Sequence, residues 1–143
     1  MEVLLTLPIV VLTLVSGVHY GIAGVTKQTV QCAASAAANE AALGGTKDDI
    51  RIAADEALSV HELKIGTGLL LLIEDASGVR CGLGDRSAYP DEPPEKRREL
   101  LNGEFRATLF VVREATGIPR SINFLGTEIN NGDLIAVATS MAH

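Results

Sequence analysis

The side chains that could do chemistry are scattered through this sequence and do not form the arrangements that catalysis needs. The three histidines, His19, His61 and His143, stand far apart, and His61-Glu62 lacks the second histidine of a metalloprotease helix. No serine stands in a G-x-S-x-G motif, and no glycine-rich phosphate loop precedes a helix. We therefore expect no catalytic residues, and the sequence predicts that the chain is not an enzyme.

Pairs of acidic residues at 48–49, 74–75 and 91–92 could bind calcium if the fold brought them together. None of them has the spacing of the twelve-residue calcium loop. The charged run at 95–99 contains both signs and balances itself. Solvated surface is the favoured interpretation of these groups, and we expect neither a metal nor another cofactor.

Length and charge restrict the possible architectures and partners. The chain has 143 residues, which is enough for one modest domain and a terminal helix. Its net charge is -6, with a pI near 5.0. Binding to nucleic acid requires a basic surface that displaces counterions from the phosphates. We therefore expect no nucleic-acid partner.

The first 25 residues are predicted to form a membrane-spanning helix. Glu2 is the only charged residue among the first 18, and residues 3–25 match the roughly 20 apolar residues that a span requires. The basic start and the cleavage site of a secretory signal peptide are both missing. No lysine or arginine precedes the span, so we expect either that the numbering starts after a leader has been removed or that the chain is truncated.

The helical pattern continues past the span as an alanine-rich amphipathic segment that Gly44 and Gly45 should end near residue 43. Pro8 removes one backbone donor and could kink the first turns. The small residues Gly17, Gly21 and Gly24 would let neighbouring helices approach closely.

Residues 45–143 are predicted to form a separate α+β head, and residues 1–44 the long helix. Apolar residues between positions 50 and 58 recur at helical spacing, which predicts a second helix at 47–60 with an N-terminal cap at Thr46. Strands are expected at 66–73, 79–83, 104–112, 121–129 and 134–141. A loop is expected at 84–94 and a short helical turn at 95–101. The sequence Asn-Asn-Gly-Asp at 130–133 predicts a hairpin between the last two strands. The fold class is therefore a second helix on an antiparallel sheet of about four or five strands, with the lower half of the long helix covering the sheet.

Cys32 and Cys81 are the only cysteines. In a chain exported from the cytoplasm they could form a disulfide between the long helix and the first hairpin, worth about 2–5 kcal/mol. The alternative is that each is a small buried apolar residue.

The first third of the chain contains Glu2 followed by Pro8 in MEVLLTLP, then an aliphatic run with Gly17, the GVHYG step and a glutamine- and alanine-rich helix. In this pattern the chain resembles the TadE-like family of pilins and pseudopilins. This resemblance implies processing by a prepilin peptidase, anchoring in the inner membrane, and assembly by the pilus machinery into an extracellular filament. The resemblance implies that Glu2 corresponds to the family glutamate that neutralises an N-terminal amine. The alternative is an interfacial glutamate without a partner. That glutamate usually stands at mature position five, so either the maturation site differs or this sequence begins inside the usual mature start.

Two functions from different classes follow. The first is a structural filament subunit, in which Glu2, Pro8, Gly17, Gly21 and Gly24 serve assembly with copies of the same chain. The second is a membrane-anchored minor pseudopilin or periplasmic accessory domain of a secretion system. The biological role of the filament, whether adhesion, secretion, motility or scaffold, is left open.

Overall fold

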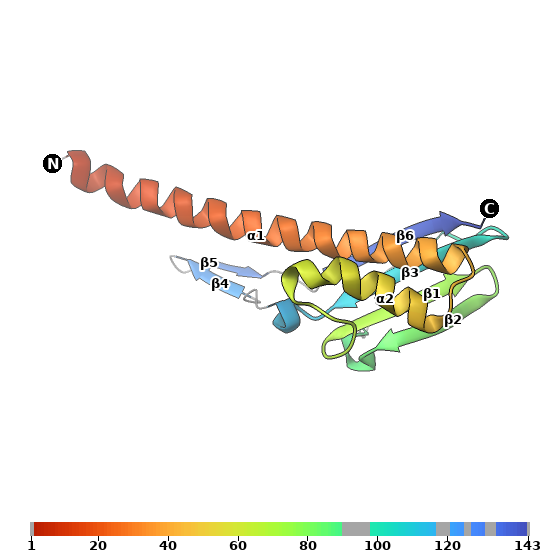
Figure 1. The fold of residues 1–143 in the computed structure, drawn as a ribbon. Coiled ribbons are helices and arrows are strands. Elements are labelled where there is room, and N and C mark those ends of the chain that lie inside the picture. Colours follow the sequence, from red (N-terminus) through yellow and green to blue (C-terminus); the bar gives the residue numbers. More distant parts are fainter. Residues whose placement is uncertain (1, 90–97, 117–120, 125–126, 131–133, 143) are drawn as a thin grey trace.

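The computed structural model describes residues 2–89, 98–116, 121–124, 127–130 and 134–142. The chain forms one very long helix, a second helix and a four-stranded antiparallel sheet, which confirms the predicted α+β class. Figure 1 shows that the long helix extends well beyond the rest of the molecule at its N-terminal end. The main elements are α1 (Glu2–Ala42), α2 (Lys47–Leu58), β1 (Leu69–Asp75), β2 (Gly78–Gly84), β3 (Glu104–Val111) and β6 (Leu134–Met141).

Helix α1 ends where the glycine pair predicts. Gly44 adopts a positive φ of 83°, and its amide donates to the carbonyl of Ala41 at 3.1 Å. The amide of Gly45 donates to the carbonyl of Glu40 at 3.0 Å. These two bonds form a Schellman motif, which satisfies carbonyls that the helix end leaves without partners. At the other end, the helix continues through Pro8.

Helix α2 begins with the predicted cap. The hydroxyl of Thr46 accepts the amide of Asp49 at 3.3 Å, and the carboxylate of Asp49 accepts the amide of Thr46 at 2.9 Å. This is a capping box. The Thr46 hydroxyl and then its amide stabilise the charged carboxylate, so the pKa of Asp49 lies below its ordinary value. The helix is followed by a short 3-10 turn, η1 (Ser59–His61).

The sheet has the strand order β2-β1-β3-β6, with all neighbours antiparallel. In β3, alternate residues face opposite sides, as the period of two in the sequence predicts. Leu109 lies in the core between the sheet and the helices, whereas Phe110 belongs to a smaller cluster on the other face. The predicted strand at 134–141 is confirmed as β6, which pairs with β3 along its whole length.

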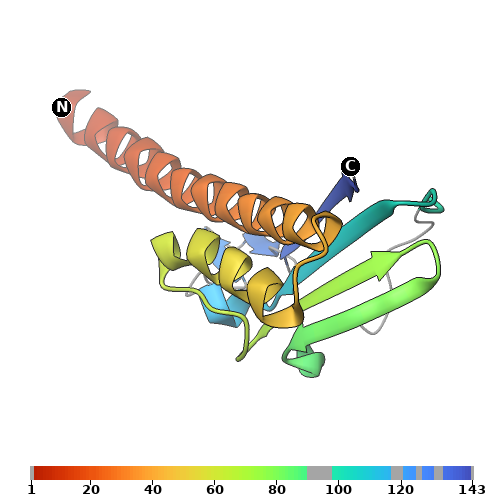
Figure 2. The same ribbon diagram turned by 45° about the vertical axis from the view of Figure 1, so that its right-hand side comes forward.

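Both helices lie on one face of the sheet, and this is where the main core lies (Figure 2). The C-terminal half of α1 contributes small side chains and one larger one, which are Val30, Ala33, Ala34, Ala37, Ala38 and Ala41. Alanine at these positions allows the helix backbone to approach the sheet closely. The predicted covering of the sheet by the lower half of the long helix is confirmed. Helix α1 ends at Ala42, two residues before the predicted boundary at residue 44, and the core draws on residues from both sides of that boundary.

The opposite face of the sheet is covered near β1 and β3 by the segment that follows β2. A 3-10 turn, η2 (Arg86–Ala88), places Ala88 against Leu70 and Phe110. The ring of Tyr89 packs on Phe110 at a centroid distance of 5.3 Å. Residues 90–94 of the predicted loop at 84–94, and residues 95–97 of the predicted helical turn at 95–101, lie outside the described residues. Residues 98–101, which are described, are not helical.

The prediction of one strand at 121–129, joined by a hairpin to the last strand, is wrong. The segment forms two strands, β4 (Ser121–Phe124) and β5 (Thr127–Asn130), that pair with each other as a separate sheet. The last strand, β6, pairs with β3 instead. Gly126 stands inside the predicted strand, and an interior glycine was a signal that the strand is interrupted. Residues 131–133, which carry most of the predicted turn, lie outside the described part of the chain.

Candidate membrane and assembly helix

The N-terminal half of α1 presents apolar side chains to the surroundings on all sides. Helix α1 is long and apolar enough to cross a membrane, by length and composition, and only 6% of its apolar window is buried in the molecule. A core helix of a soluble domain would be mostly buried, so this half is not part of the head's own core. The exposed large apolar residues are Leu7, Ile9, Val10, Val11, Leu12, Leu14, Val15, Val18, Tyr20, Ile22 and Val25.

Two threonine hydroxyls of α1, those of Thr13 and Thr26, are satisfied within the helix. Thr13 donates to the carbonyl of Ile9 at 2.8 Å and to that of Val10 at 2.9 Å. Thr26 donates to the carbonyl of Ile22 at 3.0 Å. A lipid environment offers no water to an unpaired polar group, so such internal bonds make the segment compatible with hydrocarbon.

The three predicted assembly glycines lie on one side of α1. Gly17, Gly21 and Gly24 are separated by four and three residues, which places them on one helix face. At about 100° per residue, this face lies roughly opposite to the one on which Thr26 and Val30 are buried. Apart from its chain neighbours and the nearby backbone of α1 itself, a Cβ atom built on any of the three glycines meets no described atom within 4 Å. The glycine face is therefore open space beside an exposed backbone.

The other two predicted assembly residues stand in the first turns of the helix. Glu2 is the first residue of α1, where a negative charge interacts favourably with the helix dipole. The side chain of Glu2 lies outside the described part of the structure. Pro8 is exposed within the helix.

The transition from exposed helix to head occurs within a few residues. Val25 is exposed, whereas Thr26 and Val30 are buried. The side-chain amide of Gln31 donates to the carbonyl of Val137 at 2.9 Å. This bond ties α1 to the outer edge of β6, the strand that ends the sheet, and gives one edge carbonyl a partner.

The two cysteines occupy different environments. Cys32 is exposed on α1, whereas Cys81 is buried on β2 in the main core. Both residues are described, and no disulfide joins them in this structure. The alternative interpretation, a small buried apolar residue, describes Cys81 but not Cys32.

In the described part of the head, two of the cavities are shallow and are lined in part by carboxylates that accept structural hydrogen bonds. The first, of about 330 Å³, is lined in part by Arg51, Thr67 and Asp85. The Asp85 carboxylate accepts bonds from Ser87 and from the amide of Gly68, and these bonds lower its pKa, with the Ser87 amide contributing most. Within the described ranges, no group of three or more histidine, cysteine or acidic residues could hold a metal ion.

The second cavity, of about 350 Å³, adjoins a network of charges that sequence analysis did not find. Glu104 accepts from Arg98 at 2.7 Å and from the amide of Leu101 at 2.8 Å. The guanidinium of Arg106 donates to the carbonyl of Arg98 and lies 3.7 Å from the carboxylate of Glu74. The sequence signal that could have indicated this network is the alternation in β3, which places Glu104 and Arg106 on the face opposite to the main core.

These head contacts hold loops against the sheet, whereas the large apolar side chains in the N-terminal half of α1 that the structure describes are exposed. These exposed residues come from one continuous helix rather than from separate elements. Comparison of the chain with protein-family models, with curated proteins and with solved structures finds no match, so its function must be argued from this geometry.

Proposed function

We propose that this chain is a structural subunit of a pilus-like filament. The apolar half of α1 would anchor the chain in a membrane before assembly, and would pack against the same helix of other copies after assembly. The head would remain exposed on the surface of the filament. The observation that carries this proposal is the continuous run of exposed apolar side chains between Leu7 and Val25 on a single helix.

The size of this apolar surface supports the proposal. Full burial of one leucine, isoleucine or valine side chain stabilises a protein by about 1.5–3 kcal/mol. Soluble monomers rarely expose contiguous apolar patches of this extent. The helix therefore requires either lipid or other apolar helices around it.

The open glycine face explains how copies could associate. Helices in lipid gain little from the hydrophobic effect when they meet, so their association depends on close packing. Gly17, Gly21 and Gly24 leave the backbone of α1 accessible to another helix. Because this face points roughly away from the head, a neighbouring helix can reach it without displacing the head. Identical subunits joined without ring closure form a helical polymer.

Electron microscopy of purified protein tests the proposal. We expect filaments from the natural chain, and dispersed particles from Gly21→Leu, because leucine fills the space that a neighbouring helix needs. Ser16→Leu is the matched control. It adds similar bulk about 140° around the same helix from Gly21, and should leave filaments intact. Dispersed particles from the natural chain, or filaments from Gly21→Leu, would contradict assembly through this face.

The alternative is a single membrane-anchored accessory domain of a secretion system. One helix long enough to cross a membrane is sufficient for that function. This alternative predicts that the natural chain stays monomeric in detergent and in vesicles, with no difference between Gly21→Leu and Ser16→Leu.

A further inference from the structure

We propose that the β4–β5 hairpin of one copy pairs with the outer edge of β6 in a second copy, so that the sheets of neighbouring heads are joined. This contact rests on the proposed filament and adds a second assembly surface to it, on the heads. The pairing is made by main-chain hydrogen bonds, as when an added strand extends a sheet.

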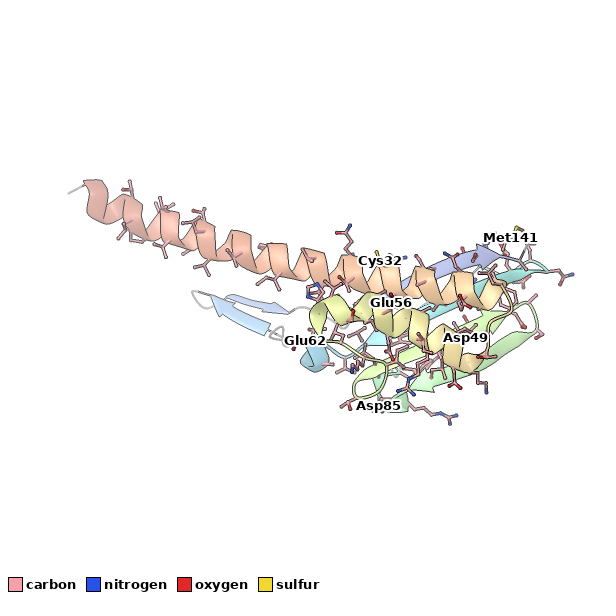
Figure 3. All side chains as sticks on the ribbon, viewed as in Figure 1. Cys32, Asp49, Glu56, Glu62, Asp85 and Met141 are labelled. Carbon is pink, nitrogen blue, oxygen red and sulfur yellow. The ribbon has the colours of Figure 1, made fainter. Side chains whose placement is uncertain are left out.

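The β4–β5 hairpin stands apart from the rest of the head. Its two strands form a sheet of their own, and no other described helix or strand packs along them. Figure 1 shows that the hairpin reaches beyond the end of α2, to the level of the projecting half of α1. In Figure 3, Met141 on β6 lies toward the opposite end of the molecule. An isolated two-stranded hairpin is marginally stable in water, so this one needs a partner outside its own head.

Lipid is not a suitable partner for the hairpin. The outer edges of a two-stranded sheet carry main-chain N–H and C=O groups without ladder partners, and hydrocarbon offers them no hydrogen bonds. In the anchored chain the hairpin therefore lies outside the hydrocarbon. It takes its place at the level of the projecting half of α1 only where protein surrounds that helix. In the proposed filament, this protein is other copies of the chain.

The outer edge of β6 has main-chain groups that can receive a strand. The amide of Ala142 donates to the carbonyl of Gly103 at 2.8 Å, so the even-numbered residues of β6 direct their main-chain groups toward β3. The odd-numbered residues direct theirs outward, and the carbonyl of Val137 accordingly accepts the side-chain amide of Gln31. Within the described ranges, the structure gives this edge no other hydrogen bond. The outward amides belong to Ile135, Val137, Thr139 and Met141.

Strand β6 lacks the features that usually protect an edge strand from pairing, which are short length, bulges, lysine and proline. It is eight residues long, keeps a regular register with β3, and contains neither a charged residue nor a proline. The side chains of Ile135, Val137 and Met141 are 41%, 43% and 52% exposed. Residues 121–130 contain one charged residue, Glu128, so pairing places no like charges opposite each other.

The sequence itself links the two surfaces. Asn-Asn-Gly-Asp at 130–133 is a hairpin signal between the segment 121–130 and β6, yet within one chain β5 and β6 belong to separate sheets. A pairing that the local sequence favours and the single chain does not make can be made between copies, by exchange of the strand. Each copy then donates its hairpin to one neighbour and accepts a hairpin from another. Such a contact does not close, and it continues along the filament.

Two half-blocked variants of the full chain test the pairing. Thr139→Pro removes one outward amide without removing a bond to β3, so it blocks the edge and keeps the hairpin. Replacement of residues 121–130 by a glycine-serine segment of equal length removes the hairpin and keeps the edge. Thr139→Val is the matched control, because it keeps the amide.

Electron microscopy is the first measurement. We expect filaments from the natural chain and from Thr139→Val, and dispersed particles from each half-blocked variant. Filaments from Thr139→Pro, or from the chain without the hairpin, would overturn the pairing and leave the filament intact. Dispersed particles from the natural chain would instead overturn the filament itself.

Amide hydrogen exchange then identifies the partner. In a mixture in detergent micelles, the hairpin of Thr139→Pro can occupy the β6 edge of an isotopically labelled chain that lacks the hairpin. We expect exchange at the labelled Ile135 and Thr139 amides to slow by about tenfold or more, while the Ala136 and Ala138 amides, which face β3, stay unchanged. Added unlabelled chain without the hairpin should have no effect.

Unchanged exchange at Ile135 and Thr139 would overturn the pairing, whether or not the natural chain forms filaments. Thermal unfolding shows whether Thr139→Pro keeps the fold. If it does not, Thr139→Lys blocks the edge by charge, and the same results are expected from it.

Discussion

At the scale of single residues, Glu62 has a backbone conformation that its side chain does not favour. It is the only described residue other than glycine with a positive φ, at 57°. Its amide donates to the carbonyl of Ser59 at 3.0 Å, and the next amide, that of Leu63, donates to Leu58 at 3.3 Å. Glycine is the usual residue at this position of a helix end, because a Cβ atom costs about 1–2 kcal/mol in the left-handed region.

This geometry predicts that Glu62→Gly stabilises the protein by about 0.5–1 kcal/mol, after the larger loss of chain entropy for glycine is subtracted. The free energy of unfolding, measured by denaturant titration of the full chain in detergent micelles, checks the prediction. Glu62→Ala is the control. It removes the same charge but keeps the Cβ atom, so it should change stability little. An equal gain from both variants would show that the charge, and not the backbone, is responsible.

At the scale of elements, strand β3 uses its first residues to hold the preceding loop in place. Glu104 accepts the amide of Leu101 and the guanidinium of Arg98, while Gly103 accepts the amide of Ala142 at 2.8 Å. The amide of Leu101 contributes most to lowering the pKa of Glu104, followed by Arg98. The charged carboxylate therefore connects the loop at 98–103 to the sheet.

The lowered pKa predicts the direction of a pH dependence. The folded pKa of Glu104 lies below its ordinary value of 4.5, so folding favours the charged form. Its stabilising effect is present above pH 4.5 and is lost as the pH falls through the folded pKa. Glu104→Gln should be less stable than the natural chain at neutral pH and lose less stability in acid.

Urea midpoints measured from neutral pH down to about pH 3 provide the check. Glu99→Gln is the matched control, since Glu99 is an exposed acid in the preceding segment. Its pH profile should follow that of the natural chain. A Glu104→Gln profile parallel to the natural one would exclude the carboxylate as a source of the acid sensitivity.

At the scale of the whole molecule, helix α1 belongs to two environments. Its first half is exposed, whereas its second half supplies one layer of the head's core. The same helix therefore joins the proposed anchor to the head without a hinge. Cutting the chain at the end of α1 would remove the anchor together with one layer of the head's core.

Truncation tests this division. A chain that starts at residue 25 should fold and remain soluble, because it keeps Val30 and the buried alanines of α1. A chain that starts at residue 45 should not fold cooperatively, because the sheet loses its main cover. Thermal unfolding followed by circular dichroism distinguishes the two. Cooperative unfolding of the shorter chain would show that the head does not need α1.

The sequence by itself determined the elements whose signals are local. The apolar run at 3–25, the cap at Thr46, the glycine stop at 44–45 and the alternation in β3 each depend on neighbours a few residues away. These features predicted the long helix, the second helix and the class of fold. They also predicted Gly17, Gly21 and Gly24 as small residues that let helices approach closely.

Only the tertiary structure decided the contacts between distant parts of the chain. The pairing of β6 with β3, the bond from Gln31 to Val137, and the separation of Cys32 from Cys81 all join segments far apart in sequence. Antiparallel strands with similar patterns can pair in several ways, and the choice depends on which apolar faces share one core. The physical reason is that local propensity specifies an element, whereas burial against the rest of the molecule specifies its partner.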